Sequence, residues 1–280
     1  RLPGMENFIP GRRRREGNDM EQQIYDKDRE GMVLRIERSS IHDGSGFRTV
    51  VFLKGCPLRC QWCSTPESQS FMPETTAGGV TYGTRMTVGQ VMREIRKDSL
   101  FYFISAGGLT LSGGEILAQS EFSLALLKNA KLECFHTAVE TSFFAPWQKI
   151  QPMLPYIDTA YVDLKMFDPQ RHKKYCGVSN EQILKNLELT NLSERKLHLI
   201  VRTPLIPGVN DSEEELSHIG RFCAGLRHLD HVELLPYHKL GTATYEKLKR
   251  PYLLGHVDTP SPAHMETCRE IVKQYVHNVR

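Results

Sequence analysis

Residues 55–65 read GCPLRCQWCST and place three cysteines, Cys56, Cys60 and Cys63, at C-x₃-C-x₂-C spacing. A disulfide framework uses cysteines in pairs, and a structural zinc site usually takes four thiolate or imidazole ligands. Cysteine thiolates are the usual ligands of iron–sulfur clusters, so three on one short loop favour a cubane cluster with one iron left unligated. Two alternatives stay open here: a zinc knuckle with a remote fourth ligand, and three buried cysteines.

The residues around the loop fit a site at the end of a strand. The run before it, TVVFLKG at 49–55, is β-branched and aromatic and ends in glycine, which is typical of a strand that leads into a loop. Beyond the loop, runs typical of strands and helices alternate with short connections, in about six β/α units. That alternation predicts an α/β fold with a parallel sheet and right-handed crossovers.

Composition narrows the class of protein. With 280 residues, the chain has room for one α/β barrel or two small domains. The formal charge of +3 gives no reason to expect nucleic acid as a partner. Seven cysteines without a secretory signal, and no apolar run long enough for a membrane span, predict a cytoplasmic protein that does not bind membranes. Because air oxidises an open cluster, an anaerobic source is expected.

Two boundaries follow from the pattern. Residues 1–31 are charged and lack periodicity, so we expect a disordered or loosely attached extension. Residues 32–280 form the core domain. Within it, residues 86–102 carry Val88, Val91, Met92 and Ile95 at helical spacing and predict one helix that Thr87 caps.

The polar residues of interest fall where strands are expected to end, which is where α/β barrels carry their chemistry. They are the cysteine loop, Gly113–Glu115 in SGGE, Glu140–Thr141, Asp163 and Lys165 in YVDLK, Arg202, and His238. Taken singly, SGGE also fits a tight turn, the Asp163–Lys165 pair a buried salt bridge, and His238 a surface histidine. Four further cysteines, Cys134, Cys176, Cys223 and Cys268, are scattered and fit small buried side chains.

Five segments in a fixed order carry a resemblance to a known family: HDGSGFRTVVFLKGCPLRCQWCSTPES, LTLSGGE, YVDLK, VRTPLIPGVND and ELLPYHKLG. With an aromatic residue, Trp62, before the third cysteine, the chain resembles the radical S-adenosylmethionine (SAM) enzymes. Within them it is similar to the glycyl-radical-enzyme activating enzymes of the formate C-acetyltransferase-activating type. Some relatives insert a ferredoxin-like segment with further clusters. This chain has no cysteine between Cys63 and Cys134, so we expect no such insert.

The resemblance implies an incomplete (β/α)₆ barrel, a partial TIM barrel open on one side. It also implies one 4Fe-4S cluster on Cys56, Cys60 and Cys63, with SAM bound beside it. The residues that it assigns to the cofactor are Trp62, Cys63, Ser64, Gly114, Glu115, Asp163, Leu164, Lys165, Arg202 and His238. Glu140 stands where a relative that binds a monovalent cation carries Asp, and Ser45 replaces a usual Pro. No catalytic acid or base is expected, because the cofactor carries the radical chemistry.

The implied function is an activating enzyme. It would cleave SAM reductively to a 5′-deoxyadenosyl radical and install a glycyl radical on a partner enzyme by abstracting hydrogen from a glycine. Its expected partners are a glycyl radical enzyme and a one-electron donor such as flavodoxin or ferredoxin, and the chain is expected to be a monomer. Two alternatives are kept: a radical SAM enzyme that acts on a small molecule, and a zinc-stabilised binding module without catalysis.

Overall fold

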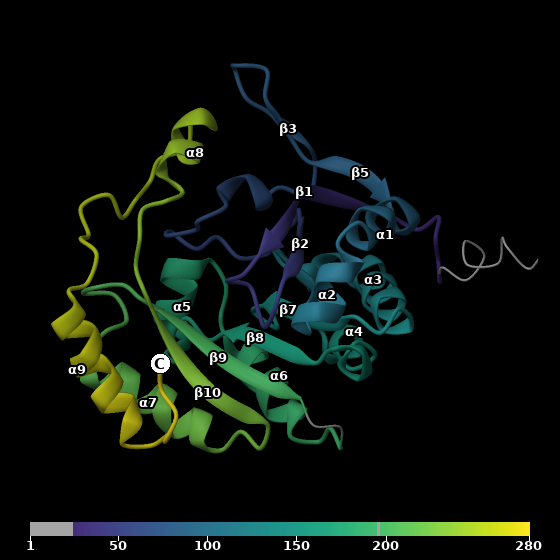
Figure 1. The fold of residues 1–280 in the computed structure, drawn as a ribbon. Helices are drawn as coiled ribbons and strands as arrows, with labels where there is room; N and C mark the ends of the chain where they lie inside the picture. Colours follow the sequence, from purple (N-terminus) through teal and green to yellow (C-terminus); the bar gives the residue numbers. More distant parts are fainter. Residues whose placement is uncertain (1–24, 195–196) are drawn as a thin grey trace, which may run out of the picture.

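One eight-stranded sheet organises the chain (Figure 1). The computed structural model describes residues 25–194 and 197–280. The strand order across the sheet is β10-β9-β8-β7-β6-β2-β1-β5. Its members are β1 (Glu30–Ser40), β2 (Arg48–Leu53), β5 (Thr84–Thr87), β6 (Gly108–Gly113), β7 (His136–Thr141), β8 (Thr159–Asp163), β9 (His198–Leu205) and β10 (Leu229–Pro236). A separate hairpin pairs β3 (Glu74–Thr75) with β4 (Thr81–Tyr82).

Six of these strands, β2 and β6 to β10, pair in parallel and in chain order. β1 pairs antiparallel with β2 and with β5 at the other edge. Among the described residues β10 and β5 form opposite edges of the sheet, so the six parallel strands form a barrel that does not close. The expected α/β fold with six parallel strands, open on one side, is confirmed.

Helices connect the strands and cover the outer face of the sheet. In Figure 1, α1 to α4 lie together on the side of the sheet where β7 and β8 are labelled, while α7 and α9 lie beside β10. The helices are α1 (Val88–Arg96), α2 (Ser99–Ser105), α3 (Ser120–Leu132), α4 (Trp147–Ile150), α5 (Pro169–Cys176), α6 (Glu181–Thr190), α7 (Glu213–Ala224), α8 (Thr242–Lys247) and α9 (Pro262–Lys273).

The structure has two helices, α1 and α2, where the sequence predicted a single helix over 86–102, so that prediction is wrong in this respect. Thr87 does cap α1, in a reciprocal pair with Gln90. The chain then breaks at Asp98, whose buried carboxylate accepts hydrogen bonds from Thr49 Oγ1 (2.8 Å) and from Arg38. Because Asp98 serves these tertiary contacts, the chain turns there and restarts as α2.

The core has two parts. The main part lies between the sheet and its helices, and it includes Leu109, Leu111, Val162 and Val201. The second part lies at the carboxyl ends of the strands and packs under the cysteine loop. Its members are Leu58, Trp62, Met166, Cys176, Ile206, Val209, Tyr237, Leu254 and Val257. Burial of these side chains fixes the loop over the barrel mouth.

The described part of the chain begins before residue 32, where the sequence predicted the core domain to start. Residues 1–24 of the expected extension lie outside the described residues. Tyr25 is described: its backbone N–H donates to Asn129 Oδ1 and its carbonyl accepts from Asn129 Nδ2, both at 2.8 Å. Glu30 and Gly31 already belong to β1. The expected boundary at residue 32 stays a prediction. In the part of the chain that the structure describes, no helix has the length and apolarity to cross a bilayer.

Candidate functional site

A cavity of about 620 Å³ opens at the carboxyl ends of the parallel strands. Every residue that the sequence assigned to the cluster or the cofactor lines it, except Leu164. Those residues are Cys56, Cys60, Trp62, Cys63, Ser64, Gly114, Glu115, Asp163, Lys165, Arg202 and His238. The structure therefore brings residues from five separate segments of the chain to one cavity.

The last turn of α5 holds the middle of the cysteine loop. The backbone N–H of Arg59 donates to the carbonyl of Cys176 at 2.7 Å, and the N–H of Gln61 donates to the carbonyl of Tyr175 at 3.0 Å. These two bonds also satisfy carbonyls that a helix leaves free at its carboxyl end. Cys60 lies between the two donors, so its position is fixed from both sides.

The Gly-Gly-Glu turn holds the start of the loop. Gly114 N–H donates to Leu53 O at 2.9 Å, and Glu115 N–H donates to Gly55 O at 2.8 Å. A Cβ on Gly114 would come within 2.5 Å of Gly55 O and 2.9 Å of Ser68 O. Only glycine fits between these carbonyls, since it has no Cβ.

The three loop cysteines suit a cubane cluster. All are free and partly exposed, and all line the same cavity. Burial raises the pKa of Cys63 to about 11 and raises that of Cys56 further, so these thiols keep their protons until a metal displaces them. Across 25–194 and 197–280 no three His, Cys, Asp or Glu side chains are placed to hold one metal ion. A cubane instead spreads three thiolates over three of its four irons.

The Glu115 carboxylate is buried and fully engaged. It accepts from Leu117 N (3.1 Å), Thr141 Oγ1 (2.5 Å), Ser142 N (2.9 Å) and Ser142 Oγ (2.5 Å). Burial raises the pKa of this carboxyl, while the hydrogen bonds from Ser142 and Thr141 oppose that shift. In this structure Glu115 joins the end of β6 to the end of β7. Its expected contact with the amino group of SAM stays a prediction.

A chain of alternating charges crosses the cavity wall. Arg202 Nη1 donates to Glu140 Oε1 at 2.8 Å, and Arg202 Nε donates to Asp163 Oδ1 at 3.3 Å. Lys165 Nζ donates to Asp163 Oδ2 at 2.7 Å. Burial opposes the ionisation of Asp163, but Lys165 and Arg202 outweigh it and hold its pKa below the usual value. Arg202 and Lys165 therefore stay charged and face the cavity beside the cysteines.

Glu140 completes that chain from β7. Besides Arg202, its carboxylate accepts from Ser112 Oγ at 2.5 Å. With both oxygens engaged by donors, Glu140 fixes Arg202 in place. The sequence singled out Glu140, Thr141 and the SGGE turn that contains Ser112 at strand ends, but it assigned none of these three residues to the cofactor, and it missed Ser142; all four line the cavity. The place of Ser142 directly after a predicted strand was the signal that could have found it.

Other expected residues differ in exposure. Trp62 is buried among the side chains under the loop, whereas Ser64 and His238 are exposed at the rim. Leu164 is buried in the main core, and its backbone N–H donates to Arg202 O at 3.0 Å. A role of Leu164 toward a cofactor would therefore have to come from its backbone.

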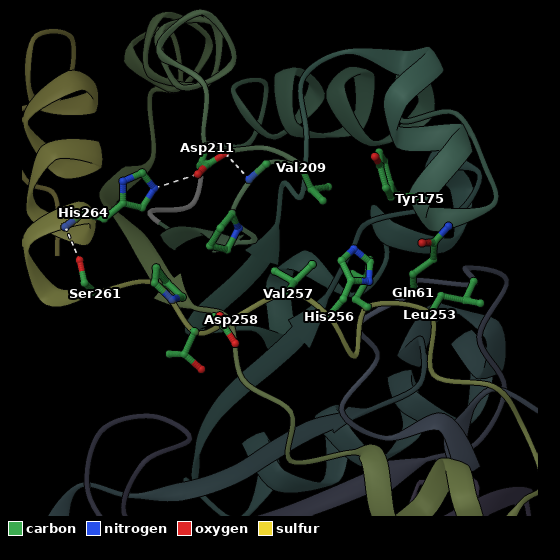
Figure 2. A pocket seen from close by; sticks show the side chains of 15 residues that line it. Gln61, Tyr175, Val209, Asp211, Leu253, His256, Val257, Asp258, Ser261 and His264 are labelled. Atoms are coloured by element: carbon green, nitrogen blue, oxygen red, sulfur yellow. Dashed lines mark hydrogen bonds and ion pairs between the residues drawn. The ribbon is translucent and has the colours of Figure 1, made fainter.

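A second hollow, of about 770 Å³, lies outside the cysteine loop (Figure 2). Gln61 of the loop and Tyr175 of α5 lie at one end of it, and Asp211 and His264 lie at the other. Asp211 Oδ1 accepts from Gly208 N and Asp211 Oδ2 lies against His264 Nε2, each at 2.8 Å. These contacts tie the segment after β9 to the start of α9, so they serve the fold.

Comparisons with known proteins agree with this geometry. The model of the radical SAM superfamily matches residues 50–218. An isethionate sulfite-lyase activating enzyme of Oleidesulfovibrio alaskensis is 39% identical over 83% of this chain and 91% of its own. A (2S)-3-sulfopropanediol sulfolyase activating enzyme of Bilophila wadsworthia is 35% identical over 90% and 99%. A crystal structure of a domain of a pyruvate-formate lyase-activating enzyme from Bacteroides vulgatus matches with a TM-score of 0.52 and 30% identity. It covers 62% of this chain and 98% of that one.

The fold and the cysteine loop define a radical SAM protein. From the match to the family model and the identity to these relatives, the chain belongs to the radical SAM superfamily and, within it, to the glycyl-radical-enzyme activating enzymes. The family uses a 4Fe-4S cluster and SAM, and the residues described above fit both groups. Family membership sets aside the zinc-stabilised binding module that the sequence left open.

Proposed function

We propose that the chain cleaves SAM reductively to a 5′-deoxyadenosyl radical and installs a glycyl radical on a partner enzyme, by abstracting hydrogen from a glycine Cα. The observation that carries the proposal is the convergence of the three loop cysteines with Lys165 and Arg202 on one cavity. The cluster, when bound, supplies the electron for cleavage. The protein supplies binding, orientation and exclusion of water.

The roles of the residues follow their chemistry. Cys56, Cys60 and Cys63 hold the cluster, and the open iron is left for the amine and carboxylate of SAM. Arg202 and Lys165 present cations to the carboxylate and ribose of SAM. Gly113 and Gly114 bring backbone atoms close to the amine of the methionine part of SAM. Glu115, the next residue, fixes the position of these two glycines. We place the adenine between Trp62 and Ser64 on one side and His238 on the other.

The open barrel supports a protein as the target. A glycine Cα inside a folded partner reaches the cavity only if its loop leaves the partner's core and enters the mouth as extended backbone. Glycine offers no side chain, so the binding energy has to come from the rim. Exposed apolar side chains stand near the cysteine loop, with Phe71 51% and Leu240 82% exposed. A small-molecule substrate would not require the barrel to be open on one side.

The names of the relatives bear on the partner. Both activating enzymes reported above are named for lyases that act on small sulfonates, with identities of 39% and 35% over most of the chain. The match to a pyruvate-formate lyase-activating enzyme is 30% identical and covers 62% of this chain. We therefore propose a carbon–sulfur lyase of the glycyl radical class as the partner. The formate C-acetyltransferase type is the second candidate.

We propose that the electron donor docks on the outer side of the cysteine loop. Arg59, Lys173 and Lys174 are exposed there, and within the described chain none of them pairs with a carboxylate. Arg59 Nη1 donates to Leu58 O at 2.7 Å, so its charge stays next to the cluster ligands. A small acidic one-electron carrier such as flavodoxin or ferredoxin suits this surface. We propose that the chain works as a monomer, because one copy supplies every residue of the cavity.

The test is a panel of purified glycyl radical enzymes, each incubated anaerobically with the reconstituted chain, SAM and a reductant. A sulfonate lyase of the panel is expected to acquire a glycyl radical, seen by paramagnetic resonance, in proportion to the 5′-deoxyadenosine formed. A peptide that copies its glycine loop should act as a weak substrate. A Gly→Ala form of the lyase should give no glycyl signal. If no panel member acquires a radical while a metabolite drives fast cofactor turnover, the target is a small molecule.

A further inference from the structure

Arg35 and Phe52 form a part of the cavity wall that the proposed binding of SAM does not use. Arg35 lies on β1 and Phe52 on β2, and the two residues face each other in the register of this antiparallel pair. Lys165 and Arg202, which we assign to SAM, lie just beyond β8 and on β9, several strands away across the sheet. The wall made by β1 and β2 is therefore free for a second ligand.

β1 borders the open side of the barrel at Arg35. β5 pairs with β1 only from Glu30 to Val33, and no other described strand pairs with β1 on that side. The open side between β1 and β10 is the route by which a partner's loop reaches the cavity. The Arg35 side chain is 37% exposed at this border and also lines the cavity. A chain that enters there comes into contact with it.

The Arg35 guanidinium is held in place but is only partly paired. Its Cζ lies 3.9 Å from the centroid of the Phe52 ring, within the range of a cation–π contact. Nε donates to Glu37 Oε1 at 2.5 Å, and Nη1 donates to Glu67 Oε1 at 3.4 Å. Among the residues that the structure describes, Nη2 has no hydrogen-bond partner. Because Nη2 of a guanidinium carries two N–H groups, Arg35 keeps oriented donors for a ligand.

The charges around Arg35 favour a neutral acceptor. Two carboxylates, Glu37 and Glu67, already face this one cation, and Asp43, from the loop between β1 and β2, lines the same cavity. A carboxylate on the ligand would add another anion beside these groups and would be repelled by them. A backbone carbonyl carries no net charge, and an extended chain presents one at every residue. The donors on Nη2 therefore suit a peptide backbone.

We propose that Arg35, stacked on the Phe52 ring, donates from Nη2 to a backbone carbonyl of the partner's glycine loop at the open side of the barrel. The inference rests on the proposed function, since it needs a protein partner. Recognition through the backbone meets what such a loop requires, because glycine offers no side chain to bind. Arg35 is a substrate-binding residue in this arrangement. Phe52 is a positioning residue, because its ring fixes the plane of the guanidinium.

The test measures peptide binding to Arg35→Gln, to Arg35→Lys and to the parent chain. The probe is a short dye-labelled peptide that copies the glycine loop of the panel lyase that acquires the radical. Its fluorescence anisotropy is measured with the reconstituted full chain and SAM, without reductant, so that no SAM is cleaved. Arg35→Gln is expected to raise the Kd about tenfold, because a hydrogen bond from a charged donor is lost. In assays of 5′-deoxyadenosine formation the same change should appear in the KM for the peptide, with kcat near that of the parent.

Arg35→Lys separates the guanidinium from its charge. Lys keeps a cation beside Glu37 and Glu67, but it lacks the planar fork that stacks and donates twice, so it should recover only part of the affinity. If urea unfolding shows that Arg35→Gln does not fold, Arg35→Lys decides the test on the same Kd. The ratio of the Kd of Arg35→Gln to that of the parent should not change with salt, because the acceptor is neutral.

Arg85→Gln is the matched control. Arg85 lies on β5 at the same border and is 61% exposed; it pairs with Glu30 at 3.2 Å and does not line the cavity. Its Kd should match that of the parent. Equal Kd values for Arg35→Gln, Arg85→Gln and the parent overturn the inference. So does a loss in Arg35→Gln that disappears at high salt, since that result would show pairing with a carboxylate. If no lyase of the panel acquires a radical, the failure lies with the proposed function, and the inference falls with it.

Discussion

Gly114→Ala tests how the cysteine loop is held. A Cβ at this position would lie 2.5 Å from Gly55 O, 2.9 Å from Gly55 C and 2.9 Å from Ser68 O, where ordinary contact begins at 3.4 Å. All three are backbone atoms, so no side chain can rotate away. One backbone has to retreat by close to an ångström, and the bond from Glu115 N to Gly55 O (2.8 Å) lies in its path. Overpacking of this kind costs about 1–3 kcal/mol.

Two measurements follow from that cost. The metal-free protein should unfold at a lower urea concentration, by a shift that corresponds to a loss of about 1–3 kcal/mol in the free energy of unfolding. The slope of that free energy against urea concentration should stay unchanged. Iron retained after reconstitution should also fall, because Gly55 precedes the first ligand. Gly78→Ala is the matched control: its Cβ would meet only Thr76 Oγ1, at 3.8 Å. If Gly114→Ala equals the control in both midpoint and iron content, the loop is not held as described.

Three further predictions concern the cluster, the pH dependence of stability and the chain's first residues. Anaerobic reconstitution should give about four irons per chain, while Cys56→Ala should give none and Cys134→Ala should match the parent; eight irons in the parent would contradict a single cluster. Burial and Arg48 lower the pKa of His136 to about 4, so the folded state loses stability as pH falls from 6.5 toward that value. His136→Gln should reduce this loss in the free energy of unfolding by about 2 kcal/mol, a value that allows for the partial exposure of the side chain. The measurement is the denaturant midpoint at several pH values across that range, and His277→Gln is the control that should leave the loss unchanged. Deletion of residues 1–24 should leave SAM cleavage and partner activation intact; a loss of activation alone would make these residues part of the docking surface.

The sequence predicted the parallel sheet and the placement of the site because both leave local signals. A strand that ends in a Gly-rich or polar turn is visible in TVVFLKG and LTLSGGE, and a barrel collects such ends at one mouth. All but one of the expected site residues accordingly line one cavity. The exception is Leu164, which only the resemblance assigned to the cofactor and whose apolar side chain is buried in the main core.

Other features depend on contacts that are distant in sequence. α5 is short and charged, and its existence rests on buried contacts of Cys176 and His172 that no periodicity reveals. The break at Asp98 depends on Thr49 and Arg38, which lie 49 and 60 residues away. Glu115 looks like a free carboxylate in SGGE, but Thr141 at the end of β7 and Ser142 directly after it, 26 and 27 residues on, donate hydrogen bonds to it. Pairings of this kind become visible only once the strands are adjacent.

The central claim is hydrogen abstraction from the glycine of a partner protein, and isotope transfer tests it most directly. A partner lyase is produced with glycine deuterated at Cα and is incubated anaerobically with the reconstituted chain, unlabelled SAM and a reductant. The 5′-deoxyadenosine formed is then analysed by mass spectrometry. One deuterium is expected in this product for each glycyl radical installed. Product without deuterium, formed at the same rate with or without the partner, would contradict it.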